Sequence, residues 1–247
     1  MIRRKKKEVL KDLPDKTKAV VLLDLNNKKE YIQAEDDVIA WISENYGPKK
    51  AAKAAMAETL VRFGILKQLA TAGKIKQVIT WIVDFLDSGE KLVVLGEHHA
   101  FINVIEEAMV KNKIKMVKFT GKTSLKAKQE AVDSFNEDPD TLLFLGTIRA
   151  AGVGINLTKA SNLMFFELDW TPGKMLQGED RIHRIGQKNA TIIWYLLSKD
   201  TIENRLMDMI DGKQKILDAV LDGKETDDGN LFAQLIENYK SKEENGC

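Results

Sequence analysis

The chain has 247 residues, of which 44% are hydrophobic and 30% charged, and its formal net charge is +1. This length and composition can bury one good core plus an appendage, and they exclude a chain that is disordered throughout. Near neutrality removes any global electrostatic argument for nucleic acid, so a DNA contact would require a local basic patch.

The cysteine and hydrophobic content narrow the class of protein further. Cys247 is the single cysteine, which excludes an internal disulfide and a cysteine-based zinc site and fits a reducing compartment. We find no signal peptide and no apolar run long enough to span a membrane. We therefore expect an intracellular protein, in cytoplasm, nucleoid or nucleus, with no membrane partner.

The first part of the chain, residues 1–73, predicts a linker and helical segment. The basic cluster at residues 3–7 fits a nucleic-acid arm, and a solvated helix explains it equally well. Residues 26–70 are charged and alanine-rich, and Asn45-Tyr-Gly-Pro48 interrupts them. This pattern predicts helices joined by a turn.

Short apolar runs alternate with helix-length segments over residues 74–221. Continuous apolar strands between helices are what a parallel sheet buried on both faces requires, so we predict an α/β lobe here. A helix is expected from Asp200-Thr-Ile-Glu203 to about residue 221, followed by a peripheral tail over 222–247. The expected strands are 92–96, 116–119, 142–146, 163–168 and 192–197.

Polar motifs follow three of these predicted strands. Gly121 follows the strand 116–119, the stretch from Thr147 to Asn156 follows 142–146, and Trp170 follows 163–168. Ligands of open parallel sheets collect at the carboxyl ends of the strands. The sequence therefore predicts a ligand site at this edge of the sheet.

The run Gln177-Gly-Glu-Asp-Arg-Ile-His-Arg-Ile-Gly-Gln187 concentrates arginines, glutamines and carboxylates. A planar guanidinium can meet two phosphate oxygens at once, which lysine cannot do. Arg181 and Arg184 are three residues apart, so both would reach toward one anion if the segment were helical. The alternatives are a solvated charged face or a structural pair between an arginine and Glu179 or Asp180.

This run resembles the last helicase motif of the SNF2 family of superfamily-two ATP-dependent DNA translocases, Gln-x-x-Asp-Arg-x-His-Arg-Ile-Gly-Gln. Thr147-Ile-Arg-Ala-Ala-Gly-Val-Gly-Ile-Asn-Leu157 resembles the preceding motif, and Phe166-Glu-Leu-Asp-Trp-Thr-Pro-Gly173 resembles the Trp-x-Pro element. The Ala-Ala and the Glu-x-x-Trp-x-Pro-Gly are most similar to the annealing-helicase or fork-remodelling branch. The opening residues 1–16 resemble the segment that enters the second motor lobe, so the resemblance extends to about residue 220.

The elements that hold ATP phosphates and metal are missing from the sequence. A P-loop requires Gly-x-x-x-x-Gly-Lys-Ser/Thr, but Gly121-Lys122-Thr123 supplies only its end, and Met116 stands where the first glycine belongs. No Asp-Glu dipeptide occurs that could form the metal-binding box. In SNF2 motors both elements belong to a first lobe. The resemblance therefore implies a second, RecA-like lobe that does not hydrolyse ATP alone.

The resemblance also implies roles for the motif residues. Arg184, and after it Arg181, would be the arginine fingers that reach ATP with Mg²⁺, held mainly by an N-terminal RecA-like lobe of the same or a separate polypeptide. No metal site is expected on this chain. Nucleotide binding would fall to Gln177, Gly152, Gly154 and Asp180. Contacts to the backbone of double-stranded DNA would come from Thr147, Arg149, Lys122, Thr123, Asn156 and Trp170. His98 lies just after a predicted strand, and we expect it in a loop near DNA rather than as a metal ligand.

Other interpretations stay open for single residues and for the whole chain. An ordinary strand-to-helix turn also explains Gly152 and Gly154, and Trp170 fits a core position equally well. His183 is expected to organise hydrogen bonds rather than transfer protons. The expected function is the second motor lobe of an SNF2-type translocase, and the alternative is a noncatalytic docking module for DNA or protein. A self-contained nucleotide kinase is excluded, because Met116 stands where the P-loop requires its first glycine and because the acidic box is missing.

Overall fold

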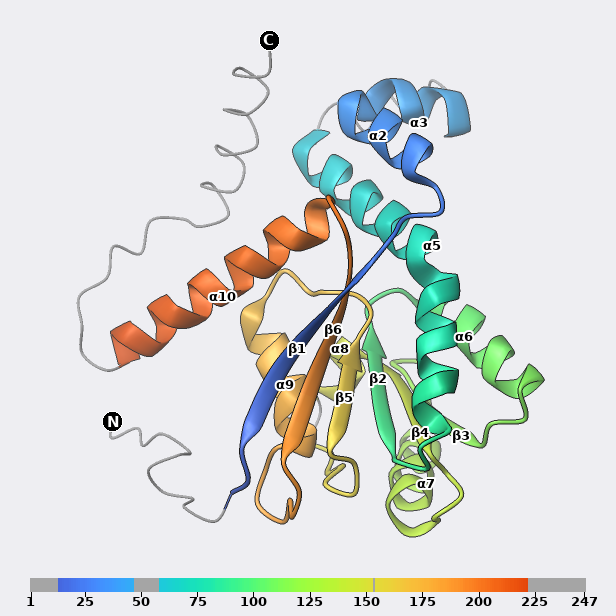
Figure 1. Cartoon of the computed structure of the whole chain (residues 1–247), viewed down its shortest axis with the longest axis vertical. Coiled ribbons are helices and arrows are strands. Elements are labelled where there is room, and N and C mark those ends of the chain that lie inside the picture. The colour runs from blue at the N-terminus through green and yellow to red at the C-terminus, as the bar shows by residue number, and fades with distance from the viewer. Residues whose placement is uncertain (1–12, 47–57, 153, 222–247) are drawn as a thin grey trace. The chain divides into compact units, whose positions relative to one another are not determined.

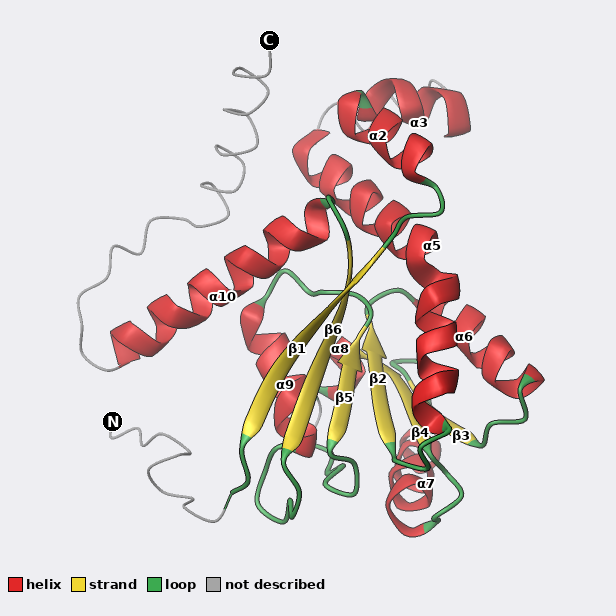
Figure 2. Ribbon diagram, in the orientation of Figure 1, coloured by secondary structure: helices red, strands yellow, loops and turns green. Residues whose placement is uncertain are grey.

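A parallel β-sheet organises the computed structural model, which describes residues 13–46, 58–152 and 154–221 (Figures 1 and 2). The sheet has six strands in the order β1-β6-β5-β2-β4-β3, and all its neighbouring strands run parallel. The chain divides into two compact units, one formed by the residues up to 26 with 70–199 and the other by 27–69 with those from 200 on. The sheet lies entirely in the first unit.

The strands in the middle of the sheet are apolar along their whole length. Every residue of β2, β4 and β5 is buried, as expected for parallel strands covered on both faces. The strand bounds are β1 (Lys16–Leu23), β2 (Leu92–Gly96), β3 (Met116–Phe119), β4 (Leu143–Thr147), β5 (Asn162–Phe165) and β6 (Thr191–Ser198).

Helices cover both faces of this sheet (Figure 2). On one face, Val78 and Ile82 of the long helix α5 (Glu58–Leu86) pack with α6 (His99–Lys111) against alternate strand residues such as Val94. On the other face lie α7 (Leu125–Glu137) and α9 (Pro172–Ile182), where Phe135 packs edge-on against Phe144. The short helix α8 (Ile148–Ala151) follows β4 directly. This two-faced packing confirms the α/β class that the sequence predicts.

The second unit is helical. It contains α2 (Lys28–Asp36), α3 (Val38–Tyr46), α10 (Ile202–Leu221) and the first part of α5. Tyr31 is fully buried there, and its hydroxyl accepts a hydrogen bond of 2.8 Å from the backbone N–H of Ile202. This bond links the two chain segments that build the unit. Among the residues that the structure describes, none of the helices could span a membrane.

The predicted strands are all present, and one observed strand was not predicted. The strands 92–96 and 116–119 have the predicted bounds, and the others differ by a few residues at their ends. The missed strand is β1, which pairs with β6 at the edge of the sheet. The predictions for the basic cluster at 3–7 and for the tail over 222–247 lie outside the described residues. The predicted domain bounds stay a prediction.

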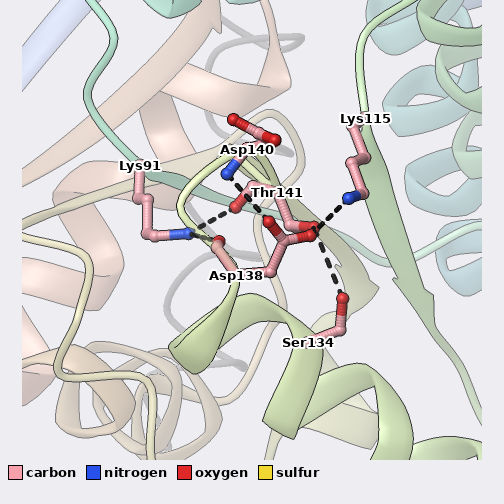
Figure 3. Close-up of polar contacts among 6 residues, drawn as sticks. All are labelled: Lys91, Lys115, Ser134, Asp138, Asp140 and Thr141. Atoms are coloured by element: carbon pink, nitrogen blue, oxygen red, sulfur yellow. Dashed lines mark hydrogen bonds and ion pairs between the residues drawn. The ribbon is translucent and has the colours of Figure 1, made fainter.

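A charged cluster fastens the chain at the amino ends of β2, β3 and β4 (Figure 3). Asp138 accepts hydrogen bonds from Lys115 at 2.5 Å, from the Thr141 hydroxyl at 2.7 Å and from the Asp140 N–H at 3.0 Å. Lys91 donates to the backbone carbonyls of Asp138 and Thr141. The Lys115 ammonium, helped by Thr141 and Asp140, holds the pKa of Asp138 well below its usual range.

The lowered pKa of Asp138 predicts a pH-dependent part of the stability. Because the folded-state pKa lies below the unfolded one, the stabilisation is complete above the ordinary Asp pKa of about 3.9 and is lost as pH falls through the folded value. We expect the melting temperature of Asp138→Asn to fall less between pH 6 and pH 2.5 than that of the wild type. Thermal unfolding at both pH values measures this, and the exposed Asp84→Asn is the matched control. Parallel losses in wild type and Asp138→Asn would contradict it.

Candidate functional site

The predicted DNA-contacting motifs meet at the carboxyl ends of the strands. A cavity of about 620 Å³ opens there, beyond the ends of β2 and β4. Its lining includes His98, Thr147 and Arg149 from the predicted set. The complete lining is Glu97, His98, His99, Gly121, Lys128, Thr147, Ile148, Arg149, Ala150, Asp169 and Lys174.

A second hollow of about 350 Å³ contains the other predicted pair, Lys122 and Thr123. His99 lines both hollows, so the two are neighbours. We call the two together the strand-end cleft. The remaining lining residues of this second hollow are Asn103, Lys118 and Thr120. Five of the predicted DNA-contacting residues therefore line these two neighbouring hollows, and Asn156 and Trp170 are absent from the lining of both.

Local hydrogen bonds shape the loop that carries Lys122. The Thr123 hydroxyl accepts from the backbone N–H of Thr120 at 3.0 Å, and Ser124 caps α7 by accepting from the Ala127 N–H at 3.3 Å. A hydroxyl that already accepts from the backbone still has its own proton to donate. The Thr123 proton can go to the Thr120 hydroxyl, 3.4 Å away, or to an anion that enters the cleft.

The cleft carries more positive than negative charge. Lys174 is paired with the buried carboxylate of Asp169 at 2.8 Å, and Lys118 is paired with Glu106. Lys122 and Arg149 are exposed, and their side chains make no ion pair within the described parts of the chain. These two cations are available to an anionic ligand such as a phosphate backbone.

Glu167 holds in place the backbone of Glu97 and His98, two residues that line the cleft. The carboxylate is 1% exposed and accepts hydrogen bonds from the backbone N–H groups of Glu97 and His98 at 2.6 and 2.8 Å. The His98 Nδ1 donates to it at 2.6 Å, and the Thr71 hydroxyl donates at 3.3 Å. Burial alone would raise the pKa of Glu167, but His98 and the two backbone amides outweigh it and lower that pKa. His98 is thus oriented by a buried charge.

The arginine motif forms the last turn of α9 and the turn after it. The helix ends at Ile182, so Arg181 is helical and Arg184 is not. Arg181 donates from Nε to the Gln177 carbonyl at 3.0 Å and from Nη2 to the Gly152 carbonyl at 3.1 Å. Arg184 donates from Nη1 to the Ile155 carbonyl at 3.3 Å. Both guanidiniums therefore bind carbonyls shortly after α8, at Gly152 and Ile155, although the motif is not one continuous helix.

The turn beyond α9 explains how Arg184 reaches its carbonyl partner. Gly186 has a φ of +101°, a conformation that glycine adopts without strain, and the Gln187 N–H donates to the Arg184 carbonyl at 3.0 Å. The buried amide of Gln187 then donates to the carbonyls of Ala160 and Ile182. Gly186 and Gln187 thereby turn the chain back and hold Arg184 beside Arg181.

The two guanidiniums interact unfavourably with each other. Partial burial lowers the pKa of Arg181 first, and the neighbouring charge of Arg184 lowers it further, against the opposing effect of Asp180. Glu179 does not pair with either arginine, because its carboxylate binds Lys16 and the Tyr195 hydroxyl. The structural pair with Glu179 considered from the sequence is therefore wrong. Two adjacent cations of this kind favour an anionic partner.

The other predicted residues near the arginines, three for nucleotide binding and Asn156 for DNA binding, fall into two groups. Gly152 and Gln177 lie with Arg181, since a Cβ at Gly152 would come within 3.2 Å of the Gln177 Oε1. Gly152 has a φ of −58°, so this position requires close approach rather than unusual backbone freedom. Gly154 is exposed, and a Cβ there would meet nothing within 4 Å. Asn156 is exposed, and its carbonyl accepts from the Asn136 amide.

Sequence reasoning missed several residues that build the site. Lys128 and Lys174 line the cleft, and Glu167 and Glu179 are buried carboxylates that hold its parts in place. The position of Lys128 on the helix after Thr123, and of Lys174 directly after the Trp-x-Pro-Gly element, could have suggested the two lysines. The partners of the carboxylates are too distant along the chain for any local pattern to reveal.

Comparison with known proteins identifies the lobe. Residues 73–186 match the helicase conserved C-terminal domain. The human DNA annealing helicase and endonuclease ZRANB3 is 31% identical over 226 residues, which are 91% of this chain and 20% of that protein. The Caenorhabditis elegans homolog of SWI/SNF-related matrix-associated actin-dependent regulator of chromatin subfamily A-like protein 1 is 32% identical, over 89% of this chain and 31% of its own length. The chain carries a helicase C-terminal domain of the SNF2 family.

A solved structure supports the fold of this SNF2 helicase domain. The C-terminal part of the Fun30 ATPase domain aligns with a TM-score of 0.65 at 20% identity, over 79% of this chain and 89% of that one. This confirms the predicted RecA-like α/β fold. The chain spans about a fifth to a third of the length of the two relatives named above.

Proposed function

We propose that this helicase domain is the second motor lobe of an SNF2-type ATP-dependent translocase on double-stranded DNA. Its arginines would act on ATP bound by a first RecA-like lobe, and the strand-end cleft would grip the DNA backbone. The observation that carries the proposal is that Arg181 and Arg184 lie close together at the carbonyls of Gly152 and Ile155, where their charges repel each other.

Two partly buried cations held side by side are costly unless an anion compensates them. A γ-phosphoryl group in transfer carries charge on several oxygens, and guanidiniums are suited to bind it. Arg181 uses two donor groups to brace α9 and the loop, whereas Arg184 makes one hydrogen bond of 3.3 Å. Arg184 therefore keeps more of its donors for a ligand and is the better arginine finger.

ATP would contact this lobe only at its surface. Arg181, Arg184 and the neighbouring Gln177 would contact its phosphates, while Asp180 and the loop at Gly152 and Gly154 would support that surface. ATP supplies the free energy of hydrolysis when bound. Among the described residues, no group of three or more histidines, cysteines and carboxylates is placed to hold a metal ion. Mg²⁺ would be held with the phosphates by the first lobe.

The DNA grip would be independent of base sequence. Lys122 and Arg149 offer charge, and Thr123 offers a hydroxyl proton, at the edge of the sheet where phosphates can approach them. Because the relatives include a DNA annealing helicase, we assign the parent motor to the branch that reanneals strands or remodels forks. Each ATP cycle would move the two lobes, and their DNA grips, relative to each other.

The proposal is tested by ATP hydrolysis in a two-lobe assembly. The chain would be mixed with, or fused to, a cognate first lobe that carries a P-loop, and turnover measured with and without duplex DNA. We expect DNA-stimulated turnover in the assembly and none from the chain alone. Failure of a well-folded chain with its cognate lobe would favour the docking module for DNA or protein. Turnover that copurifies with the isolated chain would also contradict the proposal.

The DNA grip makes a separate prediction for the chain by itself. Lys122→Ala and Arg149→Ala should each weaken binding to unrelated duplexes equally and reduce the slope of log K against log salt by about 1. Fluorescence anisotropy at several salt concentrations measures both quantities. Lys111→Ala, an exposed cation at the far end of α6, is the control and should leave the slope unchanged. An unchanged slope in both test variants would exclude the strand-end cleft as the grip.

A further inference from the structure

A buried carboxylate ties α9 to the edge strand β1. Glu179 is 1% exposed and accepts a hydrogen bond from the Tyr195 hydroxyl at 2.7 Å. Its other oxygen accepts from the Lys16 ammonium at 2.5 Å, and the Lys18 ammonium lies 3.9 Å from the first oxygen. The Lys18 ammonium also lies 5.5 Å from the centre of the Tyr195 ring. Glu179 is thus compensated by β1, an element far away in the sequence.

The same segment holds α9 at a second point. The His183 Nε2 donates to the Pro14 carbonyl at 2.9 Å, and the Thr191 N–H donates to the Asp15 carbonyl at 2.8 Å. We call residues 14–18 the entry segment. Its two attachments, Glu179 and His183, stand two residues before and two residues after Arg181. The entry segment therefore brackets the arginine motif.

Close packing makes these attachments firm. A Cβ at Gly178 would lie 3.1 Å from the Phe165 ring and 3.2 Å from Leu95, so α9 lies directly on the sheet at this point. Phe165 in turn stacks on Tyr195, with ring centres 5.5 Å apart. α9 cannot shift over the sheet without separating Glu179 from Tyr195. A buried carboxylate that loses its partners is strongly destabilising, so the attachment resists such a shift.

We propose that Glu179 is a positioning residue, which with His183 transmits the position of the entry segment to Arg181 and Arg184. The inference rests on the proposed function of these arginines, and it adds a mechanical link to it. A displacement of β1 would move the end of α9 and thereby change where the guanidiniums point. The link needs the Lys16 ammonium, because this charge compensates the buried carboxylate.

Hydrogen exchange in the chain itself tests the link without any activity. The variants are Lys16→Met and Glu179→Gln, and the matched control is Lys115→Met, which removes a lysine–carboxylate pair at the opposite edge of the sheet. We expect about tenfold faster exchange of the His183 and Leu157 amides in both test variants, because these amides bond to the carbonyls of Glu179 and Arg181. The amides of Asp138, Asp140 and Thr141 should change only in the control.

A second readout in the two-lobe assembly separates positioning from general stability. Lys16→Met should lower kcat by about tenfold with an unchanged KM for ATP, since an arginine finger acts in the transition state. Lys16→Arg, which restores the charge, should recover most of the loss. Unchanged exchange at His183 and Leu157, or equally faster exchange over the whole first unit, would overturn the link. Localised faster exchange supports it even if Arg184→Ala left turnover intact, a result that would contradict the proposed function alone.

Discussion

Replacing Arg184 by alanine should lower the DNA-stimulated ATP turnover of the two-lobe assembly by about 10³-fold, the lower end of the range for arginine fingers. The variant removes a guanidinium that makes one hydrogen bond of 3.3 Å, to the Ile155 carbonyl. We therefore expect the free energy of unfolding to fall by only about 1 kcal/mol. Turnover is measured under saturating DNA, and chemical denaturation of the chain measures the stability.

Three further variants show whether the loss of turnover comes from the paired N–H donors of the Arg184 guanidinium. Arg184→Lys keeps the charge without the paired donors, so most of the loss should remain. Lys111→Ala removes an exposed cation elsewhere and should keep wild-type turnover. Arg181→Ala should destabilise the chain more than Arg184→Ala, because Arg181 bonds to two backbone carbonyls. Full turnover in a well-folded Arg184→Ala assembly would remove Arg184 from the reaction.

Glu167→Ala should lower the free energy of unfolding by about 3 kcal/mol, because it removes a buried carboxylate that accepts hydrogen bonds from Glu97, His98 and Thr71. It leaves the backbone N–H groups of Glu97 and His98 without their acceptor, and it also frees the His98 ring and the Thr71 hydroxyl. Because the folded-state pKa of Glu167 is lowered, its stabilisation is present above the ordinary Glu pKa and is lost as pH falls. Denaturation at pH 7 measures the full effect.

The carboxamide variant separates charge from shape at this position. Glu167→Gln keeps one acceptor oxygen but not the charge, so its loss of stability should fall between the wild type and Glu167→Ala. The control is Glu130→Ala, whose carboxylate forms an exposed pair with Lys126 and should cost less than about 1 kcal/mol. A loss below about 1 kcal/mol in Glu167→Ala would show that the buried contacts contribute little.

The sheet was predictable from the sequence because its central strands are apolar without interruption. The missed strand β1 has a different residue pattern. In Lys16-Thr-Lys-Ala, charged residues alternate with small ones, which suggests a solvated linker. Its position explains the composition. As an edge strand it leaves Val20 and Leu22 about half exposed, at 51% and 50%, and it directs its lysines toward Glu179. No local pattern encodes such pairing with a strand far along the chain.

The site was predictable to the level of motifs but not of contacts. The rule that ligands collect at strand ends predicted the neighbourhood of Thr147, Arg149 and Lys122, and the structure brings all three to the cleft. The geometry of the arginines was not predictable, because α9 ends at Ile182, between them, and the turn that follows depends on the positive φ of Gly186. The support of His98 depends on Glu167, which is 69 residues away in the sequence.

The charged cluster around Asp138 has a consequence for variants of this lobe. It fastens the amino ends of the strands, whereas the cations of the cleft and the loop at Gly152 follow their carboxyl ends. Effects of substitutions at well-separated sites without shared partners add. The amino ends and the carboxyl ends of the strands can therefore be altered independently. A substitution that stabilises the cluster around Asp138 can offset a destabilising substitution in the cleft without changing any other residue that lines the cleft.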